Sequence, residues 1–100
     1  MITYEVNIKI MESVYLEYIH WLKLHIKEML NFDGFIDHQL FYHHPDIEDK
    51  SYRNIVVHYR VDCIENLEKY FSISAPNMRK QAQLQFENKF TITRRILTPL

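Results

Sequence analysis

The stretch ITYEVNIKI, residues 2–10, decides the fold class. Apolar or aromatic side chains stand at its even positions and polar side chains stand between them. This alternation is typical of a β-strand with one face in a core and the other face polar. Residues 52–61 and 90–97 alternate in the same way, and residues 35–43 carry apolar residues among polar ones. The sequence therefore predicts four strands.

Two helical segments separate these strands. After Ser13, a predicted N-cap, apolar residues recur at three- and four-residue steps to about residue 30. Gly34, the one glycine of the chain, is predicted to end this helix in the left-handed conformation. Asp62 opens a pattern with the spacing of a capping box at the start of the second helix. Pro76 interrupts that helix, so we expect it to be broken or kinked.

The order strand, helix, strand, strand, helix, strand predicts a ferredoxin-like α+β fold in one domain, residues 1–100. Two right-handed crossovers place both helices on one side of a four-stranded antiparallel sheet. We expect the helices to cover Val6, Ile8, Val57 and Tyr59. The opposite sheet face is predicted to carry Glu5, Asn7, His58, Arg60, Thr93 and Arg95. Because a monomer would expose that face, and a chain of this length has a thin core, we expect a homodimer.

Composition excludes several classes of partner and location. Twelve Lys and Arg against thirteen Asp and Glu leave a net charge of −1, which does not favour nucleic acid. A single cysteine, Cys63, favours a reducing compartment. Polar residues interrupt the apolar positions after Met1, and no apolar run approaches the ~18 residues of a membrane span. We therefore expect a cytoplasmic protein with no membrane association.

Several strings of the sequence, in their order and spacing, have the pattern of one bacterial family. They are Trp21 through Leu30, Gly34-Phe35, His58-Tyr59-Arg60, Ala75 through Arg79, and Phe86 through Phe90 into Arg94 through Leu97. Over nearly the whole chain they resemble the family called domain of unknown function 4286. The chain departs from the family pattern at Ser74, where His is expected, and at Gln85, where Arg often stands before the Phe.

The resemblance extends to the dimeric alpha-beta barrel superfamily. It implies that two ferredoxin-like sheets pair through their open faces and close a barrel around a small cavity. That superfamily includes haem-degrading enzymes, cofactor-independent oxygenases, isomerases and proteins without a known reaction, so a function taken from the fold alone is an analogy. The haem-oxygenase interpretation finds Asn7 on the first strand but no Trp on any strand, and Ser74 where His is wanted. No cofactor is predicted.

Strand parity brings one set of charged and polar residues to the same sheet face. Neighbouring strands lie about 4.8 Å apart, so Glu5 and His58 can meet as a catalytic pair, with His58 as general acid/base and Glu5 orienting it. Asn7, Arg60 and Arg95 are the predicted ligand-binding residues, the two guanidiniums forming an anion clamp. The alternative is that these residues are cross-strand pairs that only fix register and partner orientation.

A second candidate set lies on the first helix. Tyr18, Trp21 and His25 follow one another along the edge of its apolar face, where an indole and an imidazole one turn apart can wall a ligand pocket. We include Trp21 and His25 among the ligand-binding candidates. The alternative is packing, with the rings buried and their polar tips wet.

Other chemistry is not supported. His43, His44 and Asp46 do not make a metal site, because adjacent strand side chains point to opposite faces and no further ligand stands at a useful spacing. Cys63 opens the second helix, where the helix dipole can lower a thiol pKa, but no general base is evident, so we expect an inert thiol. One glycine excludes a glycine-rich phosphate loop.

The sequence leaves three functions open. The first is a homodimer whose barrel binds a small, anionic molecule through Arg60, Arg95 and His58. The second is a cofactor-independent isomerase or oxygenase that uses His58 and Glu5. The third is a structural interaction module with no ligand.

Overall fold

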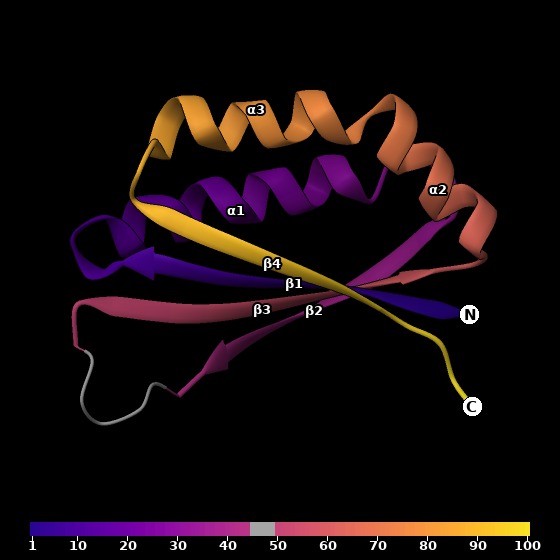
Figure 1. Ribbon diagram of the computed structural model, residues 1–100, viewed down its shortest axis with the longest axis horizontal. Coiled ribbons are helices and arrows are strands. Elements are labelled where there is room, and N and C mark those ends of the chain that lie inside the picture. The colour runs from indigo at the N-terminus through magenta and orange to yellow at the C-terminus, as the bar shows by residue number, and fades with distance from the viewer. Residues whose placement is uncertain (45–49) are drawn as a thin grey trace.

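The computed structural model describes residues 1–44 and 50–100, which form one sheet with helices on one side (Figure 1). The elements are β1 (Ile2–Met11), the 3-10 turn η1 (Glu12–Val14), α1 (Tyr15–Met29), β2 (Phe35–His43), β3 (Tyr52–Val61), α2 (Ile64–Ile73), α3 (Ala75–Phe86) and β4 (Phe90–Leu97). The four predicted strands and the broken second helix are confirmed. The predicted hairpin loop, residues 44–51, lies mostly outside the described residues.

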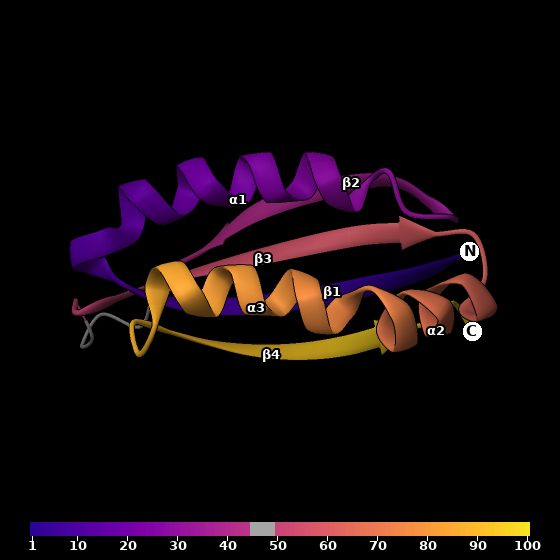
Figure 2. The same cartoon turned by 90° about the horizontal axis from the view of Figure 1, so that it is seen from above.

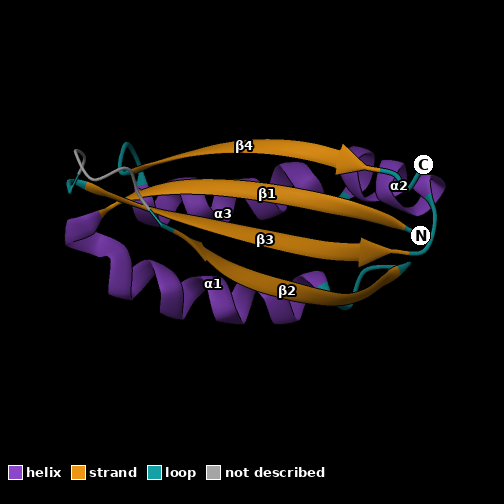
Figure 3. Ribbon diagram, turned by 90° about the horizontal axis from the view of Figure 1, so that it is seen from below, coloured by secondary structure: helices purple, strands orange, loops and turns teal. Residues whose placement is uncertain are grey.

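The sheet has the order β2-β3-β1-β4, and all neighbouring strands are antiparallel. This is the ferredoxin-like arrangement that the sequence predicted. One irregularity interrupts the register, a bulge on β2 between Phe35 and Asp37. Figure 3 shows the sheet from the side that none of the described helices covers. This side is called the open face below.

The core lies between the sheet and the helix layer. Figure 2 shows α1 on the β2 and β3 side of this layer and α3 on the β1 and β4 side. Alternation along β1 and β3 turns every second side chain toward the helices. The helices pack against these side chains with apolar residues three and four positions apart. The buried core includes Tyr4, Ile8, Ile10, Tyr18, Leu22, Ile26, Val57, Tyr59, Leu67, Met78 and Phe86.

Two predicted helix caps are wrong. Ser13 lies within η1, and the N-cap of α1 is Val14, which makes no side-chain capping hydrogen bond. The N-cap of α2 is Cys63, not Asp62. The Asp62 carboxylate accepts a hydrogen bond from Asn66 Nδ2 at 2.9 Å, a residue inside the helix.

Gly34 has the predicted left-handed backbone, with φ of +83°. Its carbonyl accepts a hydrogen bond from the Asp62 amide at 2.9 Å, which ties the start of β2 to the end of β3. A Cβ at this position would lie 2.7 Å from the Asn66 Cβ. Both the backbone angle and the close approach of α2 therefore require glycine.

The helix break lies at Ser74, which ends α2 and precedes α3. Pro76 stands in the first turn of α3, where a missing N–H leaves no helical hydrogen bond unmade. The change of direction lets α3 run along the sheet, as Figure 1 shows. None of the helices in residues 1–44 and 50–100 is both long and apolar enough to cross a membrane.

Candidate functional site

Four of the predicted site residues meet on the open face. The Glu5 carboxylate on β1 accepts hydrogen bonds from Asn7 Nδ2 at 2.7 Å and from Arg95 Nε on β4 at 2.7 Å. His58 Nε2 on β3 lies 2.8 Å from the other oxygen of Glu5. Both strand partners stand directly opposite Glu5 in the register. Glu5, Asn7, His58 and Arg95 are called the Glu5 cluster below.

The Glu5 carboxylate is covered and strongly stabilised as an anion. Its residue is 5% exposed, which is unusual for a charged side chain on an uncovered sheet face. The hydrogen bond from Arg95 is the largest cause that lowers the pKa of Glu5 to about 2, followed by the hydrogen bond from Asn7, while burial opposes them. The carboxylate is therefore ionised and fully partnered, and its three donors tie β3, β1 and β4 together.

Arg60 does not join the Glu5 cluster. Its guanidinium makes a two-pronged ion pair with Asp37 on β2, with Nε 2.7 Å from Oδ1. The Arg60 partner holds the pKa of Asp37 below its usual value. The predicted anion clamp of Arg60 and Arg95 is thus divided between two carboxylates of the chain itself. A ligand anion would have to compete with Asp37 and Glu5 for these guanidiniums.

The Glu5 cluster retains one feature of an acid/base site. His58 contacts the Phe41 ring edge to face, with centroids 5.1 Å apart, and its side chain is 28% exposed. Glu5 holds one ring nitrogen, which leaves the other to face a molecule on the open face. The arrangement can orient an imidazole for proton transfer, and it equally serves as a cross-strand link.

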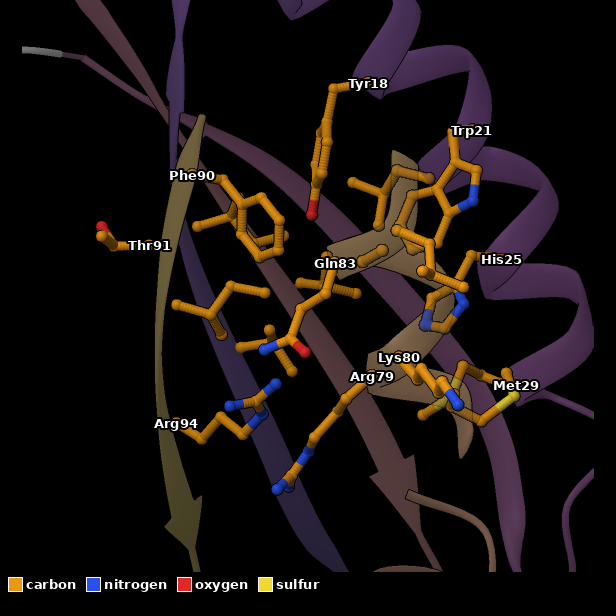
Figure 4. A pocket seen from close by; sticks show the side chains of 18 of the residues that line it. Tyr18, Trp21, His25, Met29, Arg79, Lys80, Gln83, Phe90, Thr91 and Arg94 are labelled. Atoms are coloured by element: carbon orange, nitrogen blue, oxygen red, sulfur yellow. The ribbon is translucent and has the colours of Figure 1, made fainter. Parts of the chain in front are cut away.

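A cavity of about 820 Å³ lies on the opposite side of the sheet, between the strands and the helices α1 and α3. It is called the inter-layer cavity below. Figure 4 shows side chains from both helices and from β4 pointing into it. Its lining includes Tyr4, Val6, Ile8, Tyr18, Trp21, Leu22, His25, Met29, Val57, Tyr59, Tyr70, Met78, Arg79, Lys80, Ala82, Gln83, Phe90, Ile92 and Arg94.

Trp21 and His25, which the sequence offered either as a pocket wall or as packing, both line the inter-layer cavity. Their rings stack with centroids 4.6 Å apart and planes 16° apart. His25 Nδ1 is buried without a hydrogen-bond partner, and it is the one such side-chain atom in the described part of the chain. Burial lowers the pKa of His25 to about 4, so the imidazole is neutral at pH 7.

Four tyrosines gather in the wall of the inter-layer cavity. Tyr4, Tyr18, Tyr59 and Tyr70 are each no more than 5% exposed, and all four line the cavity. Burial raises the pKa of Tyr70 to about 12, and it also raises the pKa values of Tyr18 and Tyr59. The hydroxyls of Tyr18, Tyr59 and Tyr70 are therefore protonated donors. Figure 4 shows the Tyr18 hydroxyl directed into the cavity.

Sequence reasoning missed two arginines of this cavity. Arg79 on α3 and Arg94 on β4 both line it, and Figure 4 shows both side chains on the side away from Trp21 and His25. A signal for Arg94 was present, because it shares the inward parity of Ile92 and Ile96. Arg94 lines the cavity and is nonetheless exposed, on the edge strand β4.

The residues that the structure describes show neither a metal site nor a reactive thiol. Among residues 1–44 and 50–100, no group of three or more His, Cys, Asp or Glu side chains is placed to hold a metal, and Asp46 lies outside that range. A backbone hydrogen bond with Asn66 lowers the pKa of the Cys63 thiol. Burial and the carboxylates of Asp62 and Glu65 have the opposite and larger effect, so the pKa is raised overall. A raised pKa makes the thiol less nucleophilic.

The family model that matches the chain names no activity. A family model described as a domain of unknown function, DUF4286, matches residues 1–100. No curated protein matches the chain.

Solved structures with the same fold are described with different functions. SnoaB, a cofactor-independent oxygenase from Streptomyces nogalater, has a TM-score of 0.68 at 12% identity and covers 98% of this chain and 92% of its own. The heme-degrader MhuD from Mycobacterium tuberculosis has a TM-score of 0.67 at 14% identity, covering 100% and 96%. An EthD family protein from Bacillus halodurans has a TM-score of 0.68 at 14% identity, covering 100% of both chains. At such identities the likeness concerns the fold alone.

Proposed function

This chain belongs to the DUF4286 family, and because the description of that family names no activity, we propose the function from the site: the chain binds a small molecule in the inter-layer cavity. The proposal moves the ligand from the open face, where the sequence put it, to the other side of the sheet. Trp21 and His25 then remain ligand-binding residues, and the Glu5 cluster becomes a structural link.

The observation that carries this proposal is the buried, unpartnered His25 Nδ1 in the cavity wall. A buried polar atom without a partner costs about 1 to 3 kcal/mol, so such atoms are rare unless function retains them. Because this nitrogen is covered in the structure, a ligand removes the penalty only if the imidazole turns toward the cavity. The neutral imidazole can either donate or accept, according to its tautomer.

The size and the lining of the cavity support the same function. A volume of about 820 Å³ lies within the range of about 300 to 1,000 Å³ that is typical of small-molecule sites. The wall is mostly aromatic and aliphatic, with a few polar groups that can fix an orientation, such as His25 and Gln83. Aromatic walls favour a flat or apolar ligand body.

The single tryptophan makes the proposal directly testable. Phenylnaphthylamine, a neutral aromatic probe, should accept excitation energy from Trp21 when it occupies the cavity. We expect saturable energy transfer with the wild-type protein. Ala82→Phe, which places a ring in the cavity from α3, should abolish it. Gln81→Phe adds the same ring to an exposed position outside the cavity lining and should not.

Two results would contradict the proposal. One is the absence of saturable transfer in the wild-type protein. The other is equal transfer in the Ala82→Phe and wild-type proteins, with circular dichroism showing that both are folded. Should Ala82→Phe fail to fold, Val6→Phe blocks the cavity from β1 and replaces it in the comparison.

The pair of Glu5 and His58 favours a second candidate, a cofactor-independent enzyme acting on the open face. His58 would act as general acid/base, oriented by Glu5, with Asn7, Arg60 and Arg95 contacting the substrate. Its test is deuterium exchange from solvent into a panel of enolisable aromatic ketones, followed by NMR. Catalysed exchange should be lost in His58→Gln and kept in the control His20→Gln, an exposed residue of α1. Retained exchange in His58→Gln would remove this candidate.

The proposal includes a homodimer in the cytoplasm. Apolar side chains on the open face, Phe41 at 42% and Leu97 at 37% exposed, would be covered by a second sheet. The free thiol of Cys63 suits a reducing compartment.

A further inference from the structure

We infer that the inter-layer cavity recognises an organic anion with an apolar body, held by Arg79 and Arg94 at its charged group. This inference rests on the proposed function and specifies the ligand class. The anion clamp expected of Arg60 and Arg95 is thereby reassigned to two other arginines, on the opposite side of the sheet.

The position of Arg94 is the first support. It stands opposite Val6 in the register and on the inward side of β4, in the same row as Phe90 and Ile92. An arginine at such a place puts its aliphatic part against apolar neighbours and its guanidinium at the edge of the helix layer. An edge-strand cation that only served solubility would sit better on the outward side.

Arg79 reaches the same end of the cavity from α3. Its guanidinium lies 5.8 Å from the centre of the Phe71 ring. The charges of both Arg79 and Arg94 act on the Tyr70 hydroxyl, where they oppose the effect of burial on its pKa. Two guanidiniums from different elements therefore act electrostatically on the same buried tyrosine.

The arginines of the chain divide into two groups by their partners. Arg53 is paired with Glu12, Arg60 with Asp37 and Arg95 with Glu5. Within the part of the chain that the structure describes, Arg79 and Arg94 pair with no carboxylate. The carboxylates thus neutralise the charges of the three paired arginines, whereas no carboxylate neutralises the two cavity arginines. Because bidentate guanidinium bonds to carboxylates, phosphates and sulfonates are strong, this is the charge an anion would find.

The remaining polar atoms of the wall suit an anion. Among the described residues of the lining, Glu87 is the one acidic residue, against Arg79, Lys80 and Arg94. The buried tyrosine hydroxyls stay protonated and can donate to an oxyanion. On the other side, Trp21 and the neutral His25 offer a flat surface for the apolar body (Figure 4). The charged group and the apolar body of the ligand would therefore contact different sides of the cavity wall.

Two probes that differ in one group test the inference. Anilinonaphthalene sulfonate and phenylnaphthylamine share their ring skeleton, and only the first carries a sulfonate. We expect the wild-type protein to bind the sulfonate about tenfold or more tightly, as one good charge-assisted contact supplies. The double variant Arg79→Gln, Arg94→Gln should lose that preference and keep its affinity for phenylnaphthylamine. The control Lys23→Gln, Lys27→Gln removes two exposed charges of α1 outside the cavity lining and should keep the preference.

The outcomes separate this inference from the function on which it rests. Equal affinity for both probes, or a preference that survives in the double arginine variant, overturns the anion assignment and leaves small-molecule binding standing. An equal loss of preference in the lysine control also overturns it, because the effect would then be one of net charge. Failure of both probes to bind overturns the function and the inference together. Circular dichroism of each variant confirms that losses are not due to unfolding.

Discussion

Glu5 and Arg95 are ninety positions apart in the chain, and the Glu5 carboxylate accepts a hydrogen bond from Arg95 Nε at 2.7 Å. The bond joins the central strand β1 to the edge strand β4. On the other side of β1, His58 contacts the same carboxylate. One ionised side chain thus links three of the four strands, and its protonation should be felt in the stability of the sheet.

We expect Glu5→Gln to lower the free energy of unfolding by about 2 kcal/mol at pH 7. This value is smaller than the full pKa shift would give, because solvent near the open face screens the ion pairs of Glu5. The folded pKa of about 2 lies below the ordinary value of 4.5, so the stabilisation is complete above pH 4.5 and is lost as the pH falls toward 2. Urea denaturation at several pH values should show the variant and the wild type converging at low pH. Glu68→Gln, an exposed residue of α2, is the control. A difference that is constant from pH 7 to pH 2.5 would contradict the ionic role of Glu5.

The burial of His25 predicts a different pH dependence. Its folded pKa of about 4 lies below the ordinary 6.5, so between these pH values the unfolded chain binds a proton at His25 and the folded chain does not. Stability should therefore be full above pH 6.5 and fall by roughly 2 to 3 kcal/mol between pH 6.5 and pH 4. His25→Phe should flatten this part of the curve. NMR titration of the imidazole checks the cause directly, and a midpoint near 6.5 would show that His25 is not buried as described.

Gly34→Ala should destabilise the protein by about 2 to 3 kcal/mol, seen as a Tm lower by roughly 10 °C or more. The left-handed φ of +83° strains any side chain, and the new Cβ would meet Asn66 Cβ at 2.7 Å. Gly34→Asn separates the two causes, because asparagine tolerates the angle but not the crowding. We expect it to remain clearly destabilised. A stable Gly34→Asn protein would leave the backbone angle as the sole requirement.

Val56→Arg should convert a dimer into a monomer. Val56 lies near the middle of the open face, between Asn7 on β1 and Phe41 on β2 in the register. A charge placed there would be buried without a partner in a sheet-to-sheet interface. Analytical ultracentrifugation should give twice the chain mass of 12.3 kDa for the wild type and the single mass for the variant. The control Glu68→Arg lies on α2, away from this face. A wild-type monomer at all concentrations would remove the dimer from the proposal.

Much of the fold follows from the sequence because two periods dominate it. Alternation in residues 2–10 and 54–61, broken only at Val56, indicates both the strands and their inward faces, and the inward residues Ile8 and Val57 are buried as expected. Gly34 and Pro76 mark helix boundaries through their own backbone properties, which no tertiary contact overrides. The caps at Ser13 and Asp62 failed, because a polar side chain near a helix start can bond elsewhere, as Asp62 does with Asn66.

The site was harder to predict because parity gives the face of a side chain but not its partner. Parity placed Glu5, His58 and Arg95 together correctly, and it also admitted Arg60, whose partner Asp37 is displaced by a bulge on β2 that the sequence does not reveal. The inter-layer cavity depends on how far α1 and α3 stand from the sheet. That spacing results from packing over the whole layer, and no local pattern encodes it.

The inter-layer cavity is walled by residues that also form the core, among them Leu22, Tyr59 and Met78. Occupancy and folding are therefore thermodynamically linked: a ligand that fills the space stabilises the folded state by mass action. A compound present at a hundred times its dissociation constant adds about 2.7 kcal/mol, which corresponds to a rise of roughly 10 °C or more in Tm for a chain of this size. Thermal melting of the protein against a metabolite library is thus a search for the ligand that needs no knowledge of the reaction. Melting the Ala82→Phe protein against each hit tells cavity binders from the rest.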